Sequence, residues 1–247
     1  MTAVVVTRDR PRLFADALAS VAAQSLAPLE VQVANAGGSE VAVAAQGGLE
    51  ITTVPARDRW AAAARNLAAR GARGEVLAFL DDDDRWLPDH LAHLADALAD
   101  PAVALAYSDS AVVRERVAAS GERVELERRV IARDWDPAFM RHDDYLPPST
   151  WLVRRSLFER LGGFDESFRF SEDWDFLMRA ALLTTPRRAK GVSVEIRMRE
   201  GGNASADFGL GRIDCLKRLA ARHGLPPIEP RTFWEVAEIV AAAEGRA

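Results

Sequence analysis

The stretch from residue 75 to residue 84 constrains the fold most, because an apolar run passes directly into four consecutive aspartates. The run Val-Leu-Ala-Phe-Leu at 76–80 is typical of a strand that is buried on both faces of a sheet. In open α/β sheets, ligands bind at the edge where the parallel strands end. The aspartates at 81–84 are therefore predicted to lie at a ligand-binding edge.

Short apolar runs alternate with segments of helical period over the first hundred residues, which predicts βαβ units, a mostly parallel central sheet and flanking helices. The segment 114–133 is charged and lacks a clear period, so it predicts either a hairpin or an irregular insertion. Strands are expected at 4–7, 30–34, 50–54, 75–80, 103–108 and 192–197, with one more inside 145–155. Helices are expected from Asp9 and Pro11 to about residue 24, at 57–70, after Pro88, at 172–183 and twice near the C-terminus, the last over 232–243.

Size and composition predict one continuous domain over residues 1–247, since 49% of the residues are apolar and the sequence shows no repeat or linker. Its order along the chain divides the domain into a first half at about 1–110, a second half at about 111–205 and C-terminal helices at about 206–247.

Charge and cysteine content exclude several classes of partner. The chain has 32 Lys and Arg residues against 37 Asp and Glu residues, a net charge of −5, which argues against nucleic acid as the main partner. Cys215 is the single cysteine, so an intrachain disulfide is excluded and a reducing compartment is favoured. No uncharged stretch reaches the roughly 20 apolar residues that span a bilayer, and no signal peptide is visible. We expect a cytoplasmic protein, for which peripheral membrane contact stays open.

Four adjacent carboxylates repel one another unless a cation or solvent screens them. Alternate residues of an extended segment point the same way, so Asp81 and Asp83 would present hard oxygen ligands to Mn²⁺ or Mg²⁺, completed by substrate phosphates and water. The alternative is a solvated acidic loop that caps the next helix. The position directly after a buried strand favours the metal site.

Five motifs follow one another in a distinctive order. They are Val-Val-Val-Thr-Arg-Asp-Arg-Pro at 4–11, Ala-Arg-Asn at 64–66, the block at 74–88 that holds the aspartates and ends in Trp-Leu-Pro, Gly-Gly-Phe-Asp-Glu at 162–166 and Glu-Asp-Trp-Asp at 172–175. From residue 4 to about residue 205, their order and spacing resemble the family-two inverting glycosyltransferases, which have the GT-A fold.

The resemblance implies transfer of a sugar from a nucleotide-diphosphate sugar to an acceptor hydroxyl, with inversion at the anomeric carbon. It also implies a nucleotide-sugar-binding half at about 1–110 and an acceptor-binding half at about 111–205, followed by the C-terminal helices at about 206–247. Asp83 would hold the metal with Asp81, and Asp82 would assist. Asp173 matches the catalytic base, and Glu172 would help to position the site. The residues that match the donor-binding motifs are Thr7, Arg8, Asn35, Arg65, Asn66, Asp81, Asp82 and Arg199.

Three places depart from the family pattern, and the first is Arg8, which stands where the family often has an aromatic residue. Asn35 and Ala36 stand where paired aspartates are common, so an amide would meet the nucleotide base in place of a carboxylate. Arg199 stands where a histidine often approaches metal and diphosphate, and a guanidinium there would pair with phosphate oxygens. We therefore expect the metal dependence to be shallower than is usual for the family.

Two other functions stay open at this stage. The departures allow a nucleotide-sugar-binding protein with impaired catalysis. The Asp81 and Asp83 pair after an apolar strand is also a pattern of metal-dependent phosphohydrolases, although Arg85 stands where that class has Thr or Val.

The acceptor is not specified by any motif, and a glycan, a lipid-linked molecule, a protein or a small molecule would suit. The His-Asp-Asp run at 142–144 sits in a loop just before the strand expected inside 145–155 and is a candidate substrate contact. His90 and His93, three residues apart after the acidic run, are interpreted as a pair on a helix surface, because no third metal ligand has helical spacing with them.

Overall fold

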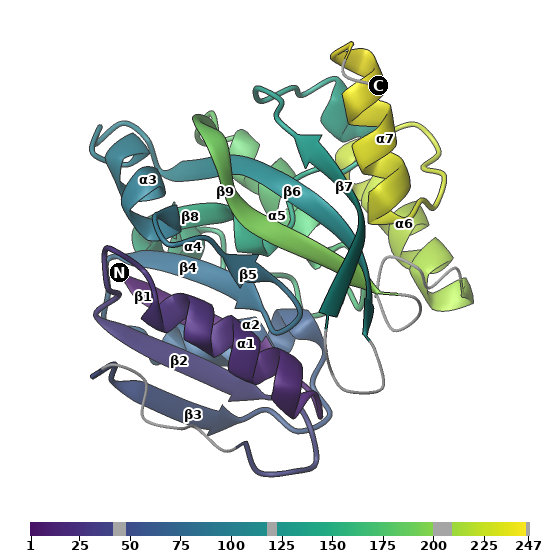
Figure 1. Cartoon of the computed structure of the whole chain (residues 1–247). Helices are drawn as coiled ribbons and strands as arrows, with labels where there is room; N and C mark the ends of the chain where they lie inside the picture. Colours follow the sequence, from purple (N-terminus) through teal and green to yellow (C-terminus); the bar gives the residue numbers. More distant parts are fainter. Residues whose placement is uncertain (42–47, 118–122, 200–208, 246–247) are drawn as a thin grey trace.

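One mixed sheet of nine strands organises the computed structural model, which describes residues 1–41, 48–117, 123–199 and 209–245 (Figure 1). The strand order is β3-β2-β1-β4-β8-β6-β9-β5, and β7 pairs with β6. The strands are β1 (Thr2–Thr7), β2 (Glu30–Asn35), β3 (Ile51–Pro55), β4 (Val76–Asp81), β5 (Arg85–Trp86), β6 (Leu105–Val117), β7 (Arg123–Ile131), β8 (Trp151–Arg154) and β9 (Arg187–Arg199).

The first four strands form the parallel part of the sheet, as the sequence pattern predicts. β1 lies between β2 and β4, and Val6 of β1 is level with Asp81 of β4. The turn after β1 and the acidic run after β4 therefore leave the sheet side by side, at the edge predicted to bind ligand.

The second part of the sheet joins distant segments of the chain. β8 pairs antiparallel with both β4 and β6, while β9 pairs parallel with β6 and antiparallel with the short β5. The charged segment at 114–133 is a hairpin of β6 and β7, which settles the choice left open by the sequence. The α/β class is as predicted, with parallel and antiparallel pairings in one sheet.

Seven α-helices are found in the described ranges: α1 (Pro11–Ala22), α2 (Ala61–Arg70), α3 (His90–Ala97), α4 (Arg155–Arg160), α5 (Glu172–Ala181), α6 (Leu210–His223) and α7 (Phe233–Ala243). Two short 3₁₀ helices, η1 (Phe139–Arg141) and η2 (Pro148–Thr150), precede β8. In Figure 1, α1 crosses the front of the sheet, and α2, α4 and α5 lie behind it. Within the described ranges, none of the helices has the length and apolar character needed to cross a membrane.

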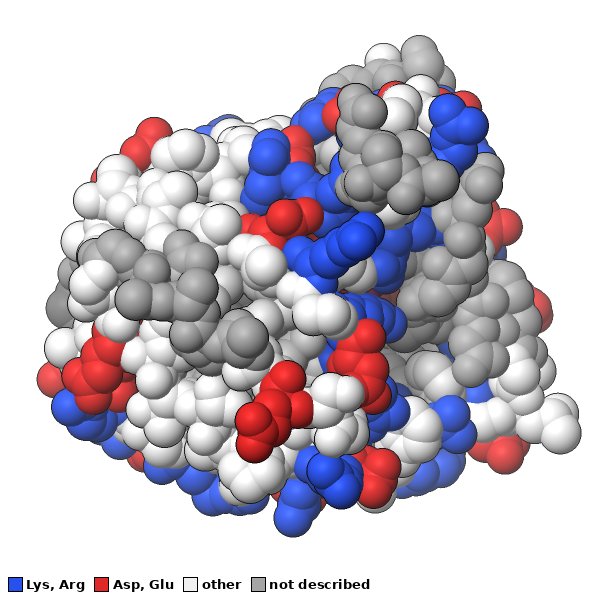
Figure 2. Space-filling view, turned by 60° about the horizontal axis from the view of Figure 1, so that its bottom comes forward, with Lys and Arg blue, Asp and Glu red and all other residues white. Residues whose placement is uncertain are grey.

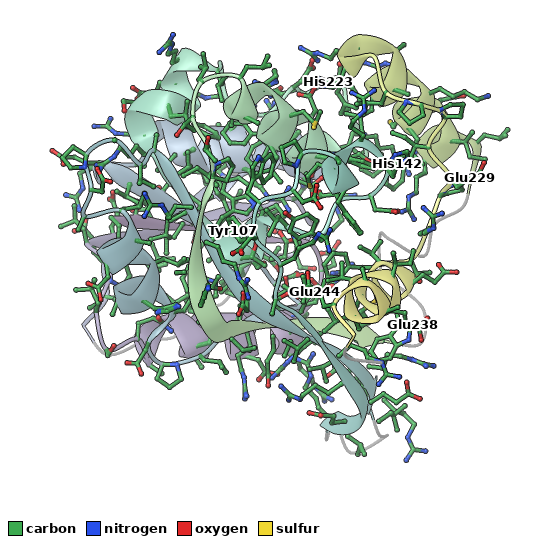
Figure 3. All side chains as sticks on the ribbon, turned by 90° about the horizontal axis from the view of Figure 1, so that it is seen from above. Tyr107, His142, His223, Glu229, Glu238 and Glu244 are labelled. Carbon is green, nitrogen blue, oxygen red and sulfur yellow. The ribbon has the colours of Figure 1, made fainter. Side chains whose placement is uncertain are left out.

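The last helix packs on its own chain. α7 contacts β6 and β7, and it buries Trp234, Val236 and Val240. Glu238 and Glu244 extend from α7, whereas Tyr107 lies in the middle of the molecule (Figure 3). The last helix therefore lies against the β6–β7 hairpin.

A cluster of five aromatic rings fixes α4 and α5 to the back of the sheet. The Trp151 ring of β8 stacks on the Phe176 ring of α5, with 5.5 Å between centroids and an interplanar angle of 2°. Phe79, Phe158 and Phe164 complete the cluster, with neighbouring centroids 5.2–5.6 Å apart. Aromatic pairs in contact stabilise a core by about 0.5–1.5 kcal/mol beyond their buried area. This packing holds the start of α5, where Glu172 and Asp173 lie, at the ligand-binding edge.

Asp9 does not cap α1, contrary to the helix-start prediction. The N-cap is Arg10, and Asp9 has a φ of 50°, which turns its carboxylate away from the helix. Asp9 Oδ1 instead accepts hydrogen bonds from the backbone N–H groups of Gly38 (3.0 Å) and Ser39 (3.3 Å). A Cβ at Gly37 would collide with Asp9, so glycine is required there. Asp9 thereby links the turns that follow β1 and β2.

The prediction of a surface pair at His90 and His93 is wrong for His90. Its side chain is fully buried, stacks on Trp86 at 4.9 Å and contacts Ser193 Oγ through Nδ1 at 2.8 Å. The covering strand β9 lies about a hundred residues later in the sequence, so the local pattern carries no sign of it. Burial lowers the pKa of His90 to about 3, which keeps the ring neutral.

Candidate active site

A cavity of about 390 Å³ opens at the carboxyl edge of the parallel strands. It is lined by the turn after β1, the acidic run after β4, the starts of α2 and α5, the segment 143–147, and residues of α6, α7 and their connection. Its size suits a small-molecule ligand. Figure 2 shows Lys and Arg side chains gathered around a hollow on this face of the molecule.

Asp82 holds the turn after β1 in place. Its Oδ2 accepts hydrogen bonds from Thr7 Oγ1 at 2.8 Å and from the Arg8 backbone N–H at 3.3 Å. Its Oδ1 pairs with Arg10 at 3.1 Å. Burial raises the pKa of Asp82, which Arg10 and Thr7 oppose. Thr7, Arg8 and Asp82 thus line the cavity together.

Asp81 and Glu172 share one buried guanidinium. Arg65 lies 2.5 Å from Asp81 Oδ1 and 2.6 Å from Glu172 Oε1, and its side chain is only 5% exposed. Burial, and next the charge of Asp173, raise the pKa of Glu172 to about 7, although Arg65 opposes both. The acidic run and the start of α5, which are ninety residues apart in sequence, are therefore held together by one ion-paired side chain.

Asp83 is held between two arginines. Its Oδ2 lies 3.0 Å from Arg10 and 2.8 Å from Arg199, which extends from the end of β9. Burial and the charges of Asp81 and Asp82 raise the pKa of Asp83 to about 6, while the two arginines lower it. Arg199 is thus brought to the acidic run, as predicted.

The two carboxylates predicted to bind metal keep one oxygen each for a ligand. Asp81 uses Oδ1 for Arg65 and Asp83 uses Oδ2 for its arginines, and among the described residues neither Asp81 Oδ2 nor Asp83 Oδ1 accepts a hydrogen bond. In the part of the chain that is described, no group of three or more His, Cys, Asp or Glu side chains forms a metal cage. Two carboxylate oxygens beside an open cavity fit a Mg²⁺ or Mn²⁺ ion that takes its other ligands from phosphate and water.

Asp173 lies in the first turn of α5 and lines the same cavity. The turn begins at Ser171, whose left-handed φ of 60° reverses the chain so that the first turn of the helix faces the cavity. Asp173 Oδ1 accepts the Trp174 backbone N–H at 2.9 Å. Burial raises the pKa of Asp173, and Arg65 lowers it. The carboxylate predicted to be the base thus lines the same cavity as the acidic run.

Three of the predicted donor-binding residues, Asn35, Asn66 and Arg199, do not line the cavity, although Arg199 pairs with the cavity residue Asp83. Asn35 closes its own turn, because Oδ1 accepts Gly37 N–H at 3.0 Å and Nδ2 donates to Ser39 O at 2.8 Å. Asn66 faces the opposite side of α2, where it accepts Phe164 N–H at 2.9 Å and donates to Phe164 O at 2.8 Å. We therefore do not propose Asn35 and Asn66 as contacts to the donor.

Gly163 makes the Asn66 contact possible. It has a φ of 74°, and a Cβ there would lie 2.5 Å from Asn66 Oδ1. The Gly-Gly turn predicted near the site therefore serves the clamp between α2 and the segment before α5.

Several cavity residues were missed by the sequence analysis. Arg10 is two residues beyond Arg8 in the same turn, a position that the motif at 4–11 includes but does not single out. Trp60 is 41% exposed and has the guanidinium carbons of Arg169 and Arg8 at 3.7 Å and 5.1 Å from its ring centroid. The residues of α6, α7 and their connection carry no motif, and only the fold brings them to the cavity.

Comparison with known protein families identifies the family of this chain. The model of the family described as "Glycosyl transferase family 2" matches residues 2–162. The chain belongs to this family. A Bacillus subtilis (strain 168) protein, the uncharacterized glycosyltransferase YwdF, is 32% identical over 234 residues, which cover 93% of this chain and 86% of that protein. This family membership separates the chain from the phosphohydrolases.

Solved structures share the GT-A fold of this glycosyltransferase. S. aureus TarS 1-349 in complex with UDP-GlcNAc matches with a TM-score of 0.63 and 17% identity, over 89% of this chain and 65% of that one. The mannosyltransferase PcManGT from Pyrobaculum calidifontis, in complex with GDP-Man and Mn²⁺, matches with a TM-score of 0.59 and 20% identity, over 100% of this chain and 75% of that one. The chain thus spans less than two thirds of the TarS fragment.

Replacement of Arg65 by Met is expected to cost about 3–5 kcal/mol of unfolding free energy at pH 8, because it leaves buried carboxylates without a counter-charge. The loss should be smaller at pH 5. Without Arg65 the pKa values of Glu172 and Asp173 rise further, so the folded state keeps protons that the unfolded state loses as the pH increases. Urea denaturation at both pH values measures this.

Arg70→Met is the matched control, since it lies on the same helix and its side chain is 61% exposed. It should change stability by less than about 0.5 kcal/mol. Equal losses for Arg65→Met and Arg70→Met would contradict the bridging role.

Proposed function

We propose that this glycosyltransferase moves a sugar from a nucleotide-diphosphate sugar to an acceptor hydroxyl, with inversion at the anomeric carbon and with the help of a divalent metal. The observation that carries this proposal is the meeting of Asp83, Asp81 and Asp173 around one cavity, with Arg65 between the last two. An acidic pair for a metal diphosphate and a separate carboxylate for the acceptor are the two parts that this reaction needs.

Asp173 is the proposed base. The acceptor oxygen attacks the anomeric carbon from the face opposite the diphosphate, the new glycosidic bond forms as the bond to the diphosphate oxygen breaks, and Asp173 takes the acceptor proton. Glu172 and Arg65 position Asp173 from behind, since they pair with each other at 2.6 Å. Binding both substrates in one cavity supplies the alignment of the reacting atoms.

Asp81 and Asp83 would hold Mn²⁺ or Mg²⁺ through the oxygens that lack protein hydrogen bonds. A bound metal ion supplies positive charge to the leaving diphosphate. Arg10 and Arg199 already bring two permanent positive charges to Asp83, and both would face the phosphates as well.

The nucleotide base would meet Ala36, Arg59 and Trp60, which line the cavity beyond Arg8. Asn35 is engaged in its own turn, so no side chain at positions 35 and 36 offers a carboxylate to the base. A flat aromatic ring beside arginines suits stacking of either a pyrimidine or a purine.

Binding of one nucleotide is the direct test. A thermal-shift panel of UDP, dTDP, GDP and CDP with Mn²⁺ should show at least one that raises the melting temperature. A ligand at about 100 times its Kd stabilises by about 2.7 kcal/mol, on the order of 5–10 °C for a chain of this size. Asp83→Ala should abolish the manganese-dependent part, whereas Asp96→Ala, on the exposed side of α3, should keep it. Absence of any shift would overturn the donor site.

Asp173→Asn separates chemistry from donor binding. Asn keeps an oxygen for the Trp174 N–H group but does not take a proton, so transfer should fall by about 10²–10⁴-fold. The nucleotide shift should stay unchanged. Release of nucleoside diphosphate, measured with the donor sugar whose nucleotide binds, gives the rate. A variant that retains more than a tenth of wild-type activity would show that another group is the base.

Arg199→His tests the shallow metal dependence. Loss of a charge-assisted contact of about 1.5–3 kcal/mol should weaken nucleotide binding in EDTA by about tenfold or more, and binding with saturating Mn²⁺ by less. Titration calorimetry in the two buffers measures both affinities. Arg116→His, an exposed change on β6, is the control. An unchanged ratio of the two affinities in Arg199→His would count against the role of Arg199.

A further inference from the structure

The carboxylates that line the cavity fall into two groups. In the first group each has an arginine within 4 Å: Asp81, Asp82, Asp83, Asp143 and Glu172. In the second group no arginine or lysine lies within that distance among the described residues: Asp144, Asp173 and Glu229. The second group lies on the side of the cavity made by the segment 143–147, α5 and the connection between α6 and α7.

Asp144 belongs to this second group and has no role in the proposed reaction so far. Its Oδ1 accepts the Leu146 backbone N–H at 2.9 Å, and this is its hydrogen bond within the described chain. Burial, and next the charge of Asp173, which lines the same cavity, raise the pKa of Asp144 well above its usual range. Burial of this carboxyl group without a counter-charge costs free energy, and its oxygens can accept more hydrogen bonds than the one from Leu146. Such a group suits a ligand that supplies hydrogen-bond donors.

An apolar wall lies beside these carboxylates. It is made by Trp174 of α5 together with Ile228 and Phe233, which precede and begin α7. The indole N–H of Trp174 donates to Met140 O at 2.9 Å, so the polar atom of that ring is already engaged. Glu229 lies on the same connection, on the same side of the molecule as His142 (Figure 3). Ile228 and Phe233 lie outside the region that matches the family.

We propose that Asp144 binds the acceptor, and that the acceptor is a hydroxylated ring, such as a sugar, without negative charge at its reacting end. This inference rests on the proposed function, because it takes Asp173 as the base for the reacting hydroxyl. Asp144 accepts a hydrogen bond from a neighbouring hydroxyl of the same ring, and the C–H face of the ring packs on the Trp174 and Ile228 wall. Carboxyl groups without a neighbouring arginine or lysine offer no ion pair to a phosphate or carboxylate in the same place, and their ionised form repels it.

Ligand-observed saturation-transfer NMR tests this with defined probes. The probes are methyl glycosides of glucose, galactose, mannose and N-acetylglucosamine, compared with glucose 6-phosphate and methyl glucuronide, each with Mg²⁺ and the nucleotide that gives the largest thermal shift. At least one neutral glycoside should bind the wild type, and the anionic probes should bind at least about tenfold more weakly.

Asp144→Asn keeps an oxygen for the Leu146 N–H group and removes the charge, so it should weaken the neutral glycoside by about tenfold or more. Asp100→Asn is the matched control, since Asp100 makes the same local contact, to Ala102 N–H at 2.9 Å, on the surface outside the cavity. Ile228→Trp is a second variant, which should block binding of the glycoside because the larger side chain fills the space beside the apolar wall. All three variants should keep the nucleotide shift.

The inference is overturned if no neutral glycoside binds, if the anionic probes bind as tightly, or if Asp144→Asn binds the glycoside like the wild type. Loss of the nucleotide shift in the wild type would instead overturn the proposed function. If Asp144→Asn alone loses that shift, the variant is misfolded, and Ile228→Trp then decides: retained glycoside binding overturns the inference and lost binding supports it.

Discussion

One buried guanidinium connects the two parts of this glycosyltransferase that the reaction requires. Arg65 sits on α2, and it pairs with Asp81 at the end of β4 and with Glu172 at the start of α5. Because charges in a protein interior are costly unless paired, none of these three groups is stable in its position without the others. Arg65 therefore couples the folding of the acidic run to the placement of Asp173, which follows Glu172 directly.

The predicted fold is correct where neighbours in the sheet are also neighbours in sequence. The strands at 4–7, 30–34 and 75–80 were found within a residue or two at each end, because buried parallel strands have an apolar pattern of their own. The pairing of β6 with β9, and the burial of His90 beneath β9, depend on segments about eighty to a hundred residues apart. The local pattern of apolar residues carries no information about such contacts, so His90 was predicted to lie on a helix surface.

The structure gathers most of the predicted charged residues around one cavity but leaves the two predicted amides outside it. Asp81 and Asp83 line the cavity, and Arg199 pairs with Asp83, because like charges at the end of a strand need cations and both kinds of residue are visible in the sequence. Asn35 and Asn66 do not reach it, because an amide has donor and acceptor groups that nearby backbone satisfies as readily as a ligand does. Type and spacing alone do not distinguish these two uses.

The distribution of paired and unpaired charge gives the cavity a direction. Arg10 and Arg199 pair with Asp83 at one end, where they would attract the diphosphate of the proposed donor, whereas Asp144 and Asp173 have no arginine or lysine within 4 Å among the described residues. Under the proposed function, a donor in the reverse orientation would place its phosphates beside these two carboxyl groups and away from both arginines, and so would lose those ion pairs. Electrostatics therefore favours one orientation of the proposed donor before any specific contact is made, with Arg65 between Asp81 and Asp173.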